Sequence, residues 1–461
     1  MENFADYSVW GGFLLVAVLL LAVITANTLK RIIKPLHNSL IPASVLGGLI
    51  LLVISFIYKL IFGQEMLETY FFGTNGSANL EIITYHSLAL GFIATAFKSQ
   101  QIKASKKRLS EIFNTGLTTV STYLLQGVFG LSVSILAALI APGFFKAAGL
   151  LLPFGYGQGT GQALNYGNIY ESDYGFIGGK SFGLSIAALG FLSASIGGVI
   201  YLNILKKKGV LSQKKEGNNV IAFNEIQGRN EIPMQESMDK ITIQFSFTTS
   251  AYLITYLVMK YLSMLIPGMR SVIFGFNFLL GVIVATVMKT IIGKLTKRGV
   301  IHRVYISDFL MTRISNFFFD LMVVAGIAAI RINVLLNYWV ILLIMGVLGL
   351  IITFIYNHIV ADKLFPEYKR EQFLMMYGML TGTAGTGTIL LREVDREFKT
   401  PAADNMVYQN FPAIVFGFPI MILATLAPVH PYLCLIILIG LFIVLNLILF
   451  RSKIFRTKAD T

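Results

Sequence analysis

The sequence predicts an all-α integral membrane protein with about eleven transmembrane helices. Three observations predict this class. Hydrophobic residues make up 55% of the 461 residues and charged residues only 13%, whereas soluble domains carry about 25% charged residues. The mean hydropathy is +0.72. The apolar residues are gathered in runs of about 20, the length that crosses a bilayer, and short basic clusters separate these runs.

The apolar runs place the spans in order along the chain. An acidic segment precedes the first run, which is about 20 residues long, so we expect a retained helix and not a cleaved signal peptide. A polar stretch over 206–240 then divides the chain. We predict a first half over 1–205, a linker over 206–240, a second half over 241–427, and an extra helix with a basic tail over 428–461. The expected spans are 8–29, 40–61, 80–97, 115–141, 177–204, 241–266, 270–293, 307–330, 334–361, 405–427 and 431–450.

Two glycine-rich segments, 146–168 and 372–391, are too interrupted to be ordinary spans. Glycine in a helix costs about 1 kcal/mol relative to alanine, and broken backbone at membrane depth is tolerated only where protein buries it or where it lines a cavity. We therefore expect two re-entrant hairpins. A pair of such breaks, one in each half of the chain, is typical of the binding site of a transporter.

The basic clusters orient the spans. All of them fall on one side if the helices alternate as placed, and the positive-inside rule makes that side the cytoplasm. The loop over 62–79, by contrast, contains Glu65 and Glu68 and no lysine or arginine. We expect a multi-pass protein of the cell membrane with its N-terminus outside and its C-terminus in the cytoplasm. The net charge of +14 is explained by these loops and does not indicate nucleic-acid binding.

This orientation gives the two halves opposite topology. Helices one to five begin outside, whereas helices six to ten begin inside, so we predict two inverted five-helix repeats with a re-entrant hairpin in each. A second similarity supports the repeat: the segment His86–Ala94 in the third span resembles Asp320–Ala328 in the eighth.

The sequence offers no sign of an enzyme. Cys434 is the single cysteine, which excludes an intrachain disulfide and a thiolate metal cluster. We find no nucleophile with a base and no carboxylate-rich metal site. The run Gly157–Gly161 lacks the spacing and the preceding strand of a dinucleotide-binding motif. We therefore expect no cofactor.

The substrate-binding candidates lie in the two glycine-rich segments. Glycine turns between half-helices expose backbone N–H groups and hydroxyls to a carboxylate, and carbonyl and hydroxyl oxygens to sodium. The alternative for each segment is glycine-mediated helix packing, which is common in membranes. The candidates are Gln158, Gly159, Thr160, Gly161 and Asn165 in the first segment, and Thr383, Gly385, Thr386, Gly387, Thr388 and Arg392 at or after the second.

Arg392 is included because arginine binds carboxylates bidentately. Most of the charged residues around it are expected to belong to a solvated cytoplasmic loop; these residues are Glu393, Asp395, Arg396, Glu397 and Lys399.

Four residues are candidates for the coupling ion. Asp320 lies within the eighth span near Asn316, and an intramembrane carboxylate suggests function because it is costly to bury. It could ligate a cation, relay a proton, or pair with a donor on another helix. Asp404 and Asn405 are expected to cap the tenth span, with ion ligation as the alternative. His86 is a possible partner for Asp320, although we expect a structurally satisfied histidine.

At these residues the chain resembles the sodium/glutamate symporter family over roughly 30–450. Gly157–Gly161 matches the Gly-x-Gly-Thr-Gly signature of that family, Ile41–Gly48 is similar to its Ile-Pro-x-x-Val-x-Gly-Gly motif, and Gly382–Leu390 corresponds to its second glycine- and threonine-rich segment. The best-known bacterial members carry histidine where Gln158 stands, and their second segment reads differently.

The resemblance implies a homodimeric carrier with a fixed scaffold and a moving transport domain. We therefore expect a secondary active transporter that couples sodium to the symport of glutamate or a related small carboxylate by an elevator-type alternation. The alternatives are a proton-coupled or exchange carrier for another organic anion and, further away, a channel, which would not accumulate its substrate.

Overall fold

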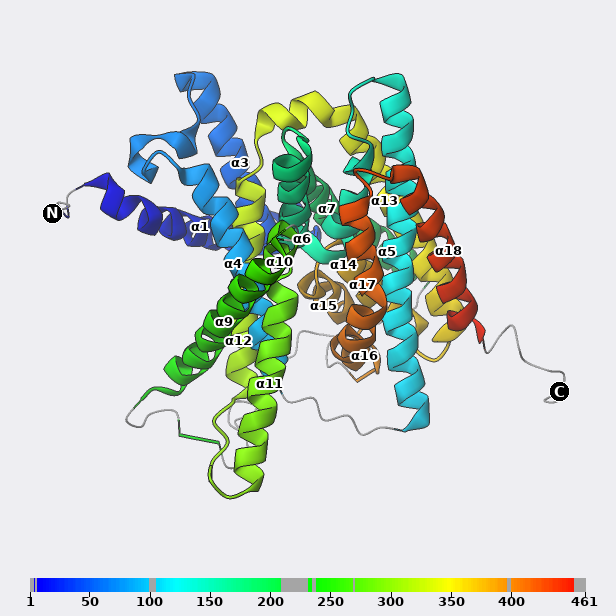
Figure 1. Ribbon diagram of the computed structural model, residues 1–461. Coiled ribbons are helices and arrows are strands. Elements are labelled where there is room, and N and C mark those ends of the chain that lie inside the picture. The colour runs from blue at the N-terminus through cyan, green and yellow to red at the C-terminus, as the bar shows by residue number, and fades with distance from the viewer. Residues whose placement is uncertain are drawn as a thin grey trace. The chain divides into compact units, whose positions relative to one another are not determined.

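The computed structural model describes residues 4, 6–98, 105–208, 231–233, 238–267, 270–395 and 399–451. The described part of the chain is almost entirely helical, with one isolated β-bridge between Glu231 and Val304 (Figure 1). The α-helices and the short 3₁₀ helices (η) are α1 Tyr7–Ile32, α2 Lys34–Asn38, α3 Ala43–Phe62, η1 Met66–Glu68, η2 Tyr70–Phe72, α4 Gly76–Phe97, α5 Lys106–Ile140, η3 Lys146–Leu150, α6 Leu151–Tyr174, α7 Gly179–Lys207, α9 Lys240–Leu265, α10 Arg270–Gly275, α11 Asn277–Lys297, α12 Asp308–Ala328, α13 Ile332–Leu364, α14 Lys369–Thr381, α15 Ala384–Arg392, α16 Ala402–Tyr408, α17 Asn410–Leu426 and α18 Pro431–Leu449.

Within the described ranges, ten helices are long and apolar enough to cross a membrane, so the chain has the character of a multi-pass membrane protein. The tenth predicted span, 405–427, is divided into α16 and α17, and the pair is bent by 52°. Counting that pair as one span gives eleven. The seventh predicted span is also interrupted, between α10 and α11. The predicted inverted repeats stay a prediction.

The chain forms two compact units. Unit 1 comprises Met1–Glu81, Lys103–Leu211 and Val323–Thr461, and unit 2 comprises Ile82–Ile102 and Ser212–Met322. This division differs from the predicted boundaries at 205 and 241, because unit 1 gathers helices from both halves of the sequence. Both glycine-rich segments belong to unit 1.

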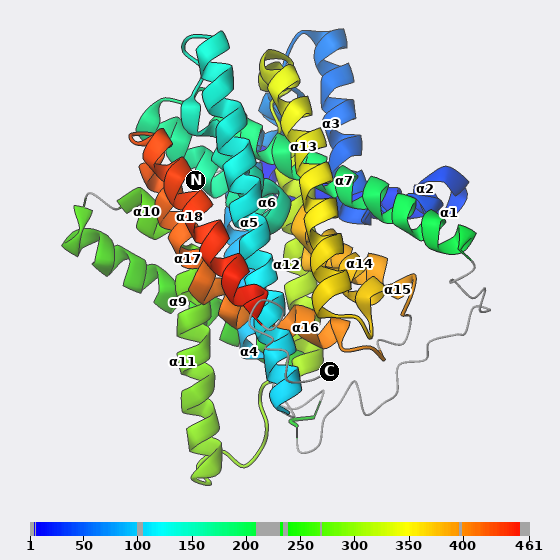
Figure 2. The same cartoon turned by 90° about the vertical axis from the view of Figure 1, so that its right-hand side faces the viewer.

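Unit 1 is built around α5 and α7. Helix α18 runs beside α5 (Figure 2), and α17 also packs against α5. Helices α6, α13 and α14 contact α7. A buried apolar cluster joins the C-terminal part of α7 to α13, α14 and α15; its members are Tyr201, Leu205, Ala361, Phe373, Leu374, Tyr377 and Leu390.

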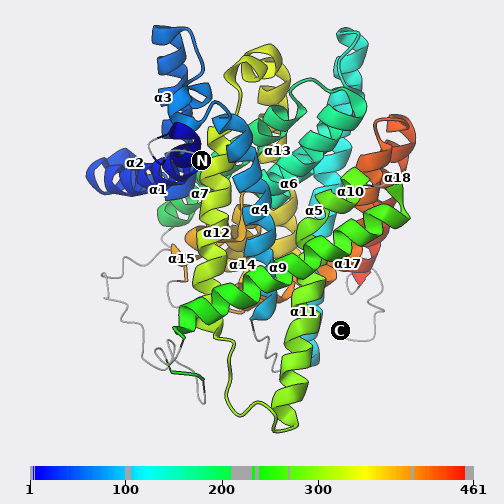
Figure 3. The same ribbon diagram turned by 60° about the vertical axis from the view of Figure 1, so that its left-hand side comes forward.

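Unit 2 contains most of α4 and α12 together with α9, α10 and α11, of which α9 and α11 lie side by side (Figure 3). Its core is apolar and includes Ile93, Phe97 and Met311. His86 forms a hydrogen bond of 2.7 Å between its Nδ1 and the Tyr252 hydroxyl. The expectation that His86 is structurally satisfied is therefore confirmed.

Close backbone contact fixes one crossing in unit 1. A methyl group added to Gly149 of η3 would collide with the backbone carbonyl of Gly130 in α5, and one added to Gly130 would collide with that of Gly149. Small residues allow membrane helices to approach in this way, and the interhelical contact replaces a hydrophobic driving force that lipid does not supply.

We expect Gly149→Ala to lower the stability of the purified protein by about 1–3 kcal/mol, because the added methyl forces the two backbones apart. Gly440→Ala in α18 is the matched control, since no described atom lies within 4 Å of the position its methyl would take. Thermal unfolding in detergent measures both. Equal melting temperatures for the two variants would contradict the packing argument.

Candidate functional site

The first glycine-rich segment breaks α6 at Gly159, whose φ of 80° and ψ of −171° interrupt the helix. Only glycine adopts this backbone region readily. The two parts of α6 fold back on one another. This is shown by the rings of Phe154 and Tyr166, which lie on either side of Gly159 and stack with centroids 3.9 Å apart. Phe145, just before η3, stacks on Phe176 at 4.8 Å. We call this helical hairpin, residues 145–176 with its tip at Gly159, hairpin 1.

The second glycine-rich segment breaks between α14 and α15. Gly382 (φ −146°, ψ −107°) and the extended Thr383 separate the two helices. The helices pack tightly, since a methyl group on Gly378 would lie 2.8 Å from the Cα atom of Gly387. We call α14 and α15, with their tip at Gly382, hairpin 2. The sequence predicted a break in each segment; that each hairpin re-enters the membrane face it left stays a prediction.

Both tips lie against the middle of α7. A methyl group on Gly190 would lie 2.5 Å from the Thr381 carbonyl oxygen and 3.3 Å from the Cα atom of Tyr156. Ser193, one turn further along, accepts a hydrogen bond of 2.7 Å at its carbonyl from the Tyr377 hydroxyl, and its own hydroxyl lies 2.8 Å from that of Tyr156. One turn of α7 therefore contacts residues next to both tips.

From that turn the two hairpins extend along α7 in opposite directions. Hairpin 1 packs along the N-terminal half of α7. There a methyl group on Gly183 would lie 2.4 Å from the Ala163 carbonyl oxygen, and one on Gly179 would lie 2.7 Å from the Gly167 carbonyl oxygen. Hairpin 2 follows the C-terminal half, where Gly198 meets Leu390. The bases of the hairpins consequently lie toward opposite ends of one helix.

Each tip joins the end of one helix to the start of another. The first half of α6 and all of α14 end at the tips, so their C-terminal carbonyls carry partial negative charge there. The second half of α6 and all of α15 begin at the tips, so their N-terminal N–H groups carry partial positive charge. Both tips can thus offer donors to an anion and acceptors to a cation.

The structure places most of the predicted substrate residues at these tips. Thr160 is fully buried, as is Asn165 to within a few per cent, and Gly159 and Gly161 are buried as well, while Gln158 is half-buried. In hairpin 2, Thr386 and Gly387 are buried, Thr383 and Thr388 are half-buried, and Gly385 is exposed. The hydroxyls of Thr383 and Thr386 lie 3.5 Å apart.

Arg392 is not brought to the tips. It is exposed and ends α15, eight residues from the first residue of that helix, which is about 12 Å along the helix axis. A direct role for Arg392 at the tip of hairpin 2 therefore has no support from its position.

The predicted ion ligands are divided between the two units. Asn316 and Asp320 belong to unit 2, where both side chains are exposed. Asp404 and Asn405 belong to unit 1 and do not cap α16, because that helix begins at Ala402, so the predicted capping role is wrong. Asp404 is exposed, whereas Asn405 is buried and donates to the Tyr368 hydroxyl at 3.0 Å. Among the described residues, no group of three or more His, Cys, Asp or Glu is arranged to hold a metal.

A polar face of α5 was missed in the sequence. Thr115, Thr119, Thr122 and Gln126 are all buried, and their spacing puts them on one side of the helix. They bond in turn to Gln372, Gln409, Asn357 and Thr353 on other helices of unit 1. The period of these polar residues in the sequence could have revealed the face, but not its partners.

Gln162 of hairpin 1 is a further candidate because of its environment. Its Oε1 accepts a hydrogen bond of 3.1 Å from Asn165. Its Nε2 is buried and donates to no atom in the part of the chain that the structure describes. A buried donor without a partner costs about 1–3 kcal/mol, so this amide is available to an acceptor on a ligand.

A charged cluster lies beside hairpin 1 near the start of α7. Lys180 donates to Glu81 at 2.7 Å, with only 20% and 12% of these side chains exposed, and Arg331 lies 3.6 Å from the same carboxylate. The backbone amide of Lys180 donates to Glu171 at 3.1 Å. In a partly buried pair of this kind, loss of one partner leaves the other charge uncompensated, which is costly.

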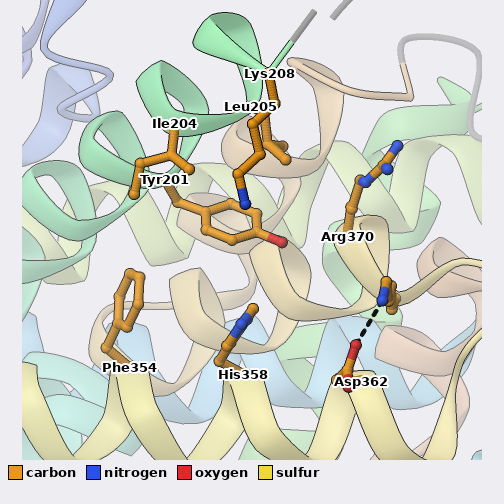
Figure 4. Close-up of a pocket in the computed structure, with 9 residues that line it drawn as sticks. Tyr201, Ile204, Leu205, Lys208, Phe354, His358, Asp362 and Arg370 are labelled. Carbon is orange, nitrogen blue, oxygen red and sulfur yellow. Dashed lines mark hydrogen bonds and ion pairs between the residues drawn. The ribbon is translucent and has the colours of Figure 1, made fainter. Parts of the chain in front are cut away.

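At the other end of α7 lies a cavity of about 410 Å³. Lys208, His358 and Arg370 surround the ring of Tyr201 there (Figure 4), and Asp362 pairs with Lys369 at 2.5 Å. None of the described tip residues lines this cavity. Its excess of basic side chains can raise the local concentration of anions near the base of hairpin 2.

The chain was also compared with known proteins. No model of a protein family matches it, and no characterised protein matches it.

Asp395 is an exception in the charged loop after α15, most of which was expected to be solvated. Its exposed fraction is only 8%. Its carboxylate accepts from the amide of Lys399 at 2.9 Å and from the amide and hydroxyl of Thr400 at 2.8 and 2.6 Å. Glu393 is exposed as expected, and Arg396 and Glu397 lie outside the described residues.

Burial raises the pKa of the Asp395 carboxyl, but the hydrogen bonds from Thr400 and Lys399 outweigh burial and hold that pKa below its ordinary value of 3.8. A carboxyl with a lowered pKa stabilises the fold above its unfolded pKa, and this contribution is lost as the pH falls through the folded value.

We expect Asp395→Asn to lower stability at pH 7 by about 1–2 kcal/mol, because it removes a charged acceptor of three hydrogen bonds. The deficit should persist down to about pH 4 and narrow below it. Melting temperatures of wild type and variant across this range test the prediction, with Glu393→Gln as the control. A deficit that narrows already between pH 7 and pH 5 would contradict it.

Proposed function

We propose that the chain is a secondary active transporter of the cell membrane that couples sodium to the symport of glutamate or a related small carboxylate. The observation that carries the proposal is the meeting of two glycine-broken tips at one turn of α7, next to Gly190. Broken helices that point half-helix ends at a common place are how transporters bind ions and anionic substrates within the bilayer.

Helix polarity supports an anionic substrate with a cation. The N-terminal ends at the tips attract a carboxylate, and the C-terminal ends attract a sodium ion. Gln162 adds a buried amide donor near the tip of hairpin 1, and this donor has no acceptor among the described residues. The buried hydroxyl groups of Thr160 and Thr386 add further polar groups beside the two tips.

The direction of the hairpins supports alternating access. If α7 spans the bilayer, the bases of the two hairpins lie toward opposite membrane faces. By the charge distribution, hairpin 1 enters from outside and hairpin 2 from the cytoplasm. A site between such tips is reached from either face in turn when unit 1 shifts, which agrees with an elevator-type cycle.

The choice of glutamate as substrate, of sodium as coupling ion and of a homodimer as the assembly is inferred from the family resemblance of Gly157–Gly161 and the residues after Gly382. A carrier for another organic anion, coupled to protons or working by exchange, would use the same tips. The transport assay below separates these possibilities.

We expect purified protein in liposomes to accumulate labelled glutamate under an inward sodium gradient. Parallel arms replace sodium by potassium, apply an inward proton gradient, or preload the liposomes with unlabelled substrate. Uptake that is unchanged in potassium would contradict sodium coupling. Accumulation only with the proton gradient or only with preloading would identify the alternative carriers.

We expect Thr386→Val to lower kcat/KM for uptake about tenfold or more, because a hydrogen bond to a charged group contributes about 1.5–3 kcal/mol. Thr425→Val in α17 is the matched control, because the Thr425 hydroxyl lies outside the candidate site and donates within its own helix to the Ile422 carbonyl at 2.8 Å. Gln162→Glu should raise KM as well, since it replaces the donor by an acceptor. Normal transport by Thr386→Val would count against hairpin 2 as part of the site.

A further inference from the structure

Four buried polar residues meet between α5 and α13, next to the end of α14. The Nε2 of Gln126 donates to the Thr353 hydroxyl at 2.8 Å and to the Leu380 carbonyl at 3.0 Å. The Nδ2 of Asn357 donates to the Thr353 carbonyl at 2.9 Å and to the Thr122 hydroxyl at 3.4 Å. All four polar side chains are at most 1% exposed. This cluster therefore lies in the interior of unit 1.

Backbone carbonyls fix which way both amides face. A carbonyl oxygen only accepts, so the NH₂ group of Gln126 must face Leu380 and that of Asn357 must face the carbonyl of Thr353. The amide oxygens consequently point elsewhere. Oε1 of Gln126 and Oδ1 of Asn357 are buried and accept no hydrogen bond from any described residue.

Two buried acceptors without a donor in one cluster require a partner. Buried polar atoms of folded proteins are nearly always satisfied, and an exception points to a bound water or ion. The surroundings favour a positive charge, because Leu380 lies in the last turn of α14 and the C-terminal end of a helix carries partial negative charge. No described residue of the cluster carries a charge of its own.

We propose that Oε1 of Gln126 and Oδ1 of Asn357 bind a monovalent cation beside the tip of hairpin 2. In the transport reaction this cation is sodium. Neutral oxygen atoms are ligands for hard cations, and a low ligand charge suits a single positive charge better than a double one. Identification of the cation as the coupling ion rests on the proposed function; its binding does not. This site differs from the sequence-predicted ligands Asn316, Asp320, Asp404 and Asn405.

The position of the site links the cation to the substrate. The same α14 that supplies the Leu380 carbonyl ends at the tip of hairpin 2, one residue before Gly382. A cation held at Gln126 and Asn357 would fix this end of α14 and so the turn that presents Thr383 and Thr386. Cation binding would in this way favour the arrangement that binds the carboxylate.

The cation is tested first without transport. Melting temperatures of the purified full chain are measured while sodium chloride replaces choline chloride at constant ionic strength. We expect a saturating rise of about 3–5 °C, because a ligand bound only by the native state stabilises it. A melting temperature that does not depend on sodium would overturn the proposal and leave water as the partner of the two oxygens.

Two variants then locate the cation. Asn357→Asp and Gln126→Glu keep the shape of each side chain and convert the amide into a carboxylate. Each variant adds a negative charge for the cation and removes the amide donor to the Thr353 or Leu380 carbonyl. At pH 8 each should lower the half-saturating sodium concentration about tenfold or more. The difference in half-saturating sodium concentration from wild type should disappear when the pH is lowered until the new carboxyl is protonated.

Asn446→Asp in α18 is the matched control. It makes the same change at a half-buried membrane asparagine whose Oδ1 already accepts from the Tyr356 hydroxyl at 2.8 Å. We expect it to leave the half-saturating concentration unchanged. If Asn357→Asp and Gln126→Glu also leave it unchanged, or if Asn446→Asp lowers it as much, the assigned site is wrong.

Transport measurements separate the two proposals. Sodium-driven uptake whose sodium dependence is the same in wild type, Asn357→Asp and Gln126→Glu would retain the transporter and refute this site. Sodium-dependent stability that follows the two variants, together with absence of substrate uptake, would retain the site and refute the proposed function.

Discussion

The structure depends on one constraint: backbone that leaves a helix inside a membrane protein must find its hydrogen-bond partners within the protein. The chain breaks its helices twice in unit 1, at Gly159 and at Gly382, and both breaks are covered rather than exposed to lipid. The covering surface is α7, whose glycines let the hairpin backbones come within contact distance. Carbonyls near both breaks accept hydrogen bonds from α5, where Tyr123 donates to Gly157 and Gln126 donates to Leu380, each at 3.0 Å. Close packing on α7 brings the two tips to one place, so a requirement of stability positions the candidate site.

The pattern of buried polar groups follows from the same constraint. The polar face of α5 is tolerable in an apolar interior because nearly every hydroxyl and amide on it meets a partner on α13, α14 or the start of α17. Some buried polar atoms have no partner among the described residues. They include a donor on Gln162 and acceptors on Gln126 and Asn357, and others lie elsewhere, such as the hydroxyl of Ser121 on α5 and the Oδ1 of Asn405. Donor and acceptor lie on different elements, which fits a site that holds an anion and a cation in separate places.

Much of this arrangement could be predicted from the sequence, and the failures have physical causes. Hydropathy located the spans, and the glycine content of two segments located both breaks, because these signals are local. Pairings between distant segments have no local signal. The partners of Gln126 come from residues more than two hundred positions away, at Thr353 and Leu380. Asp395 reads as a loop residue, but the chain returns at Lys399 and Thr400 to bury it.

The contact of both tips with a single turn of α7 has a mechanical consequence. A gate that opens by swinging one tip away from the site would have to leave Gly190 and Ser193, and with them the surface against which the other tip is also packed. Neither hairpin can therefore act as a separate lid without a cost to its counterpart. Unit 1 is packed as one block at this turn, and in the proposed transporter access to either membrane face would require displacement of that block.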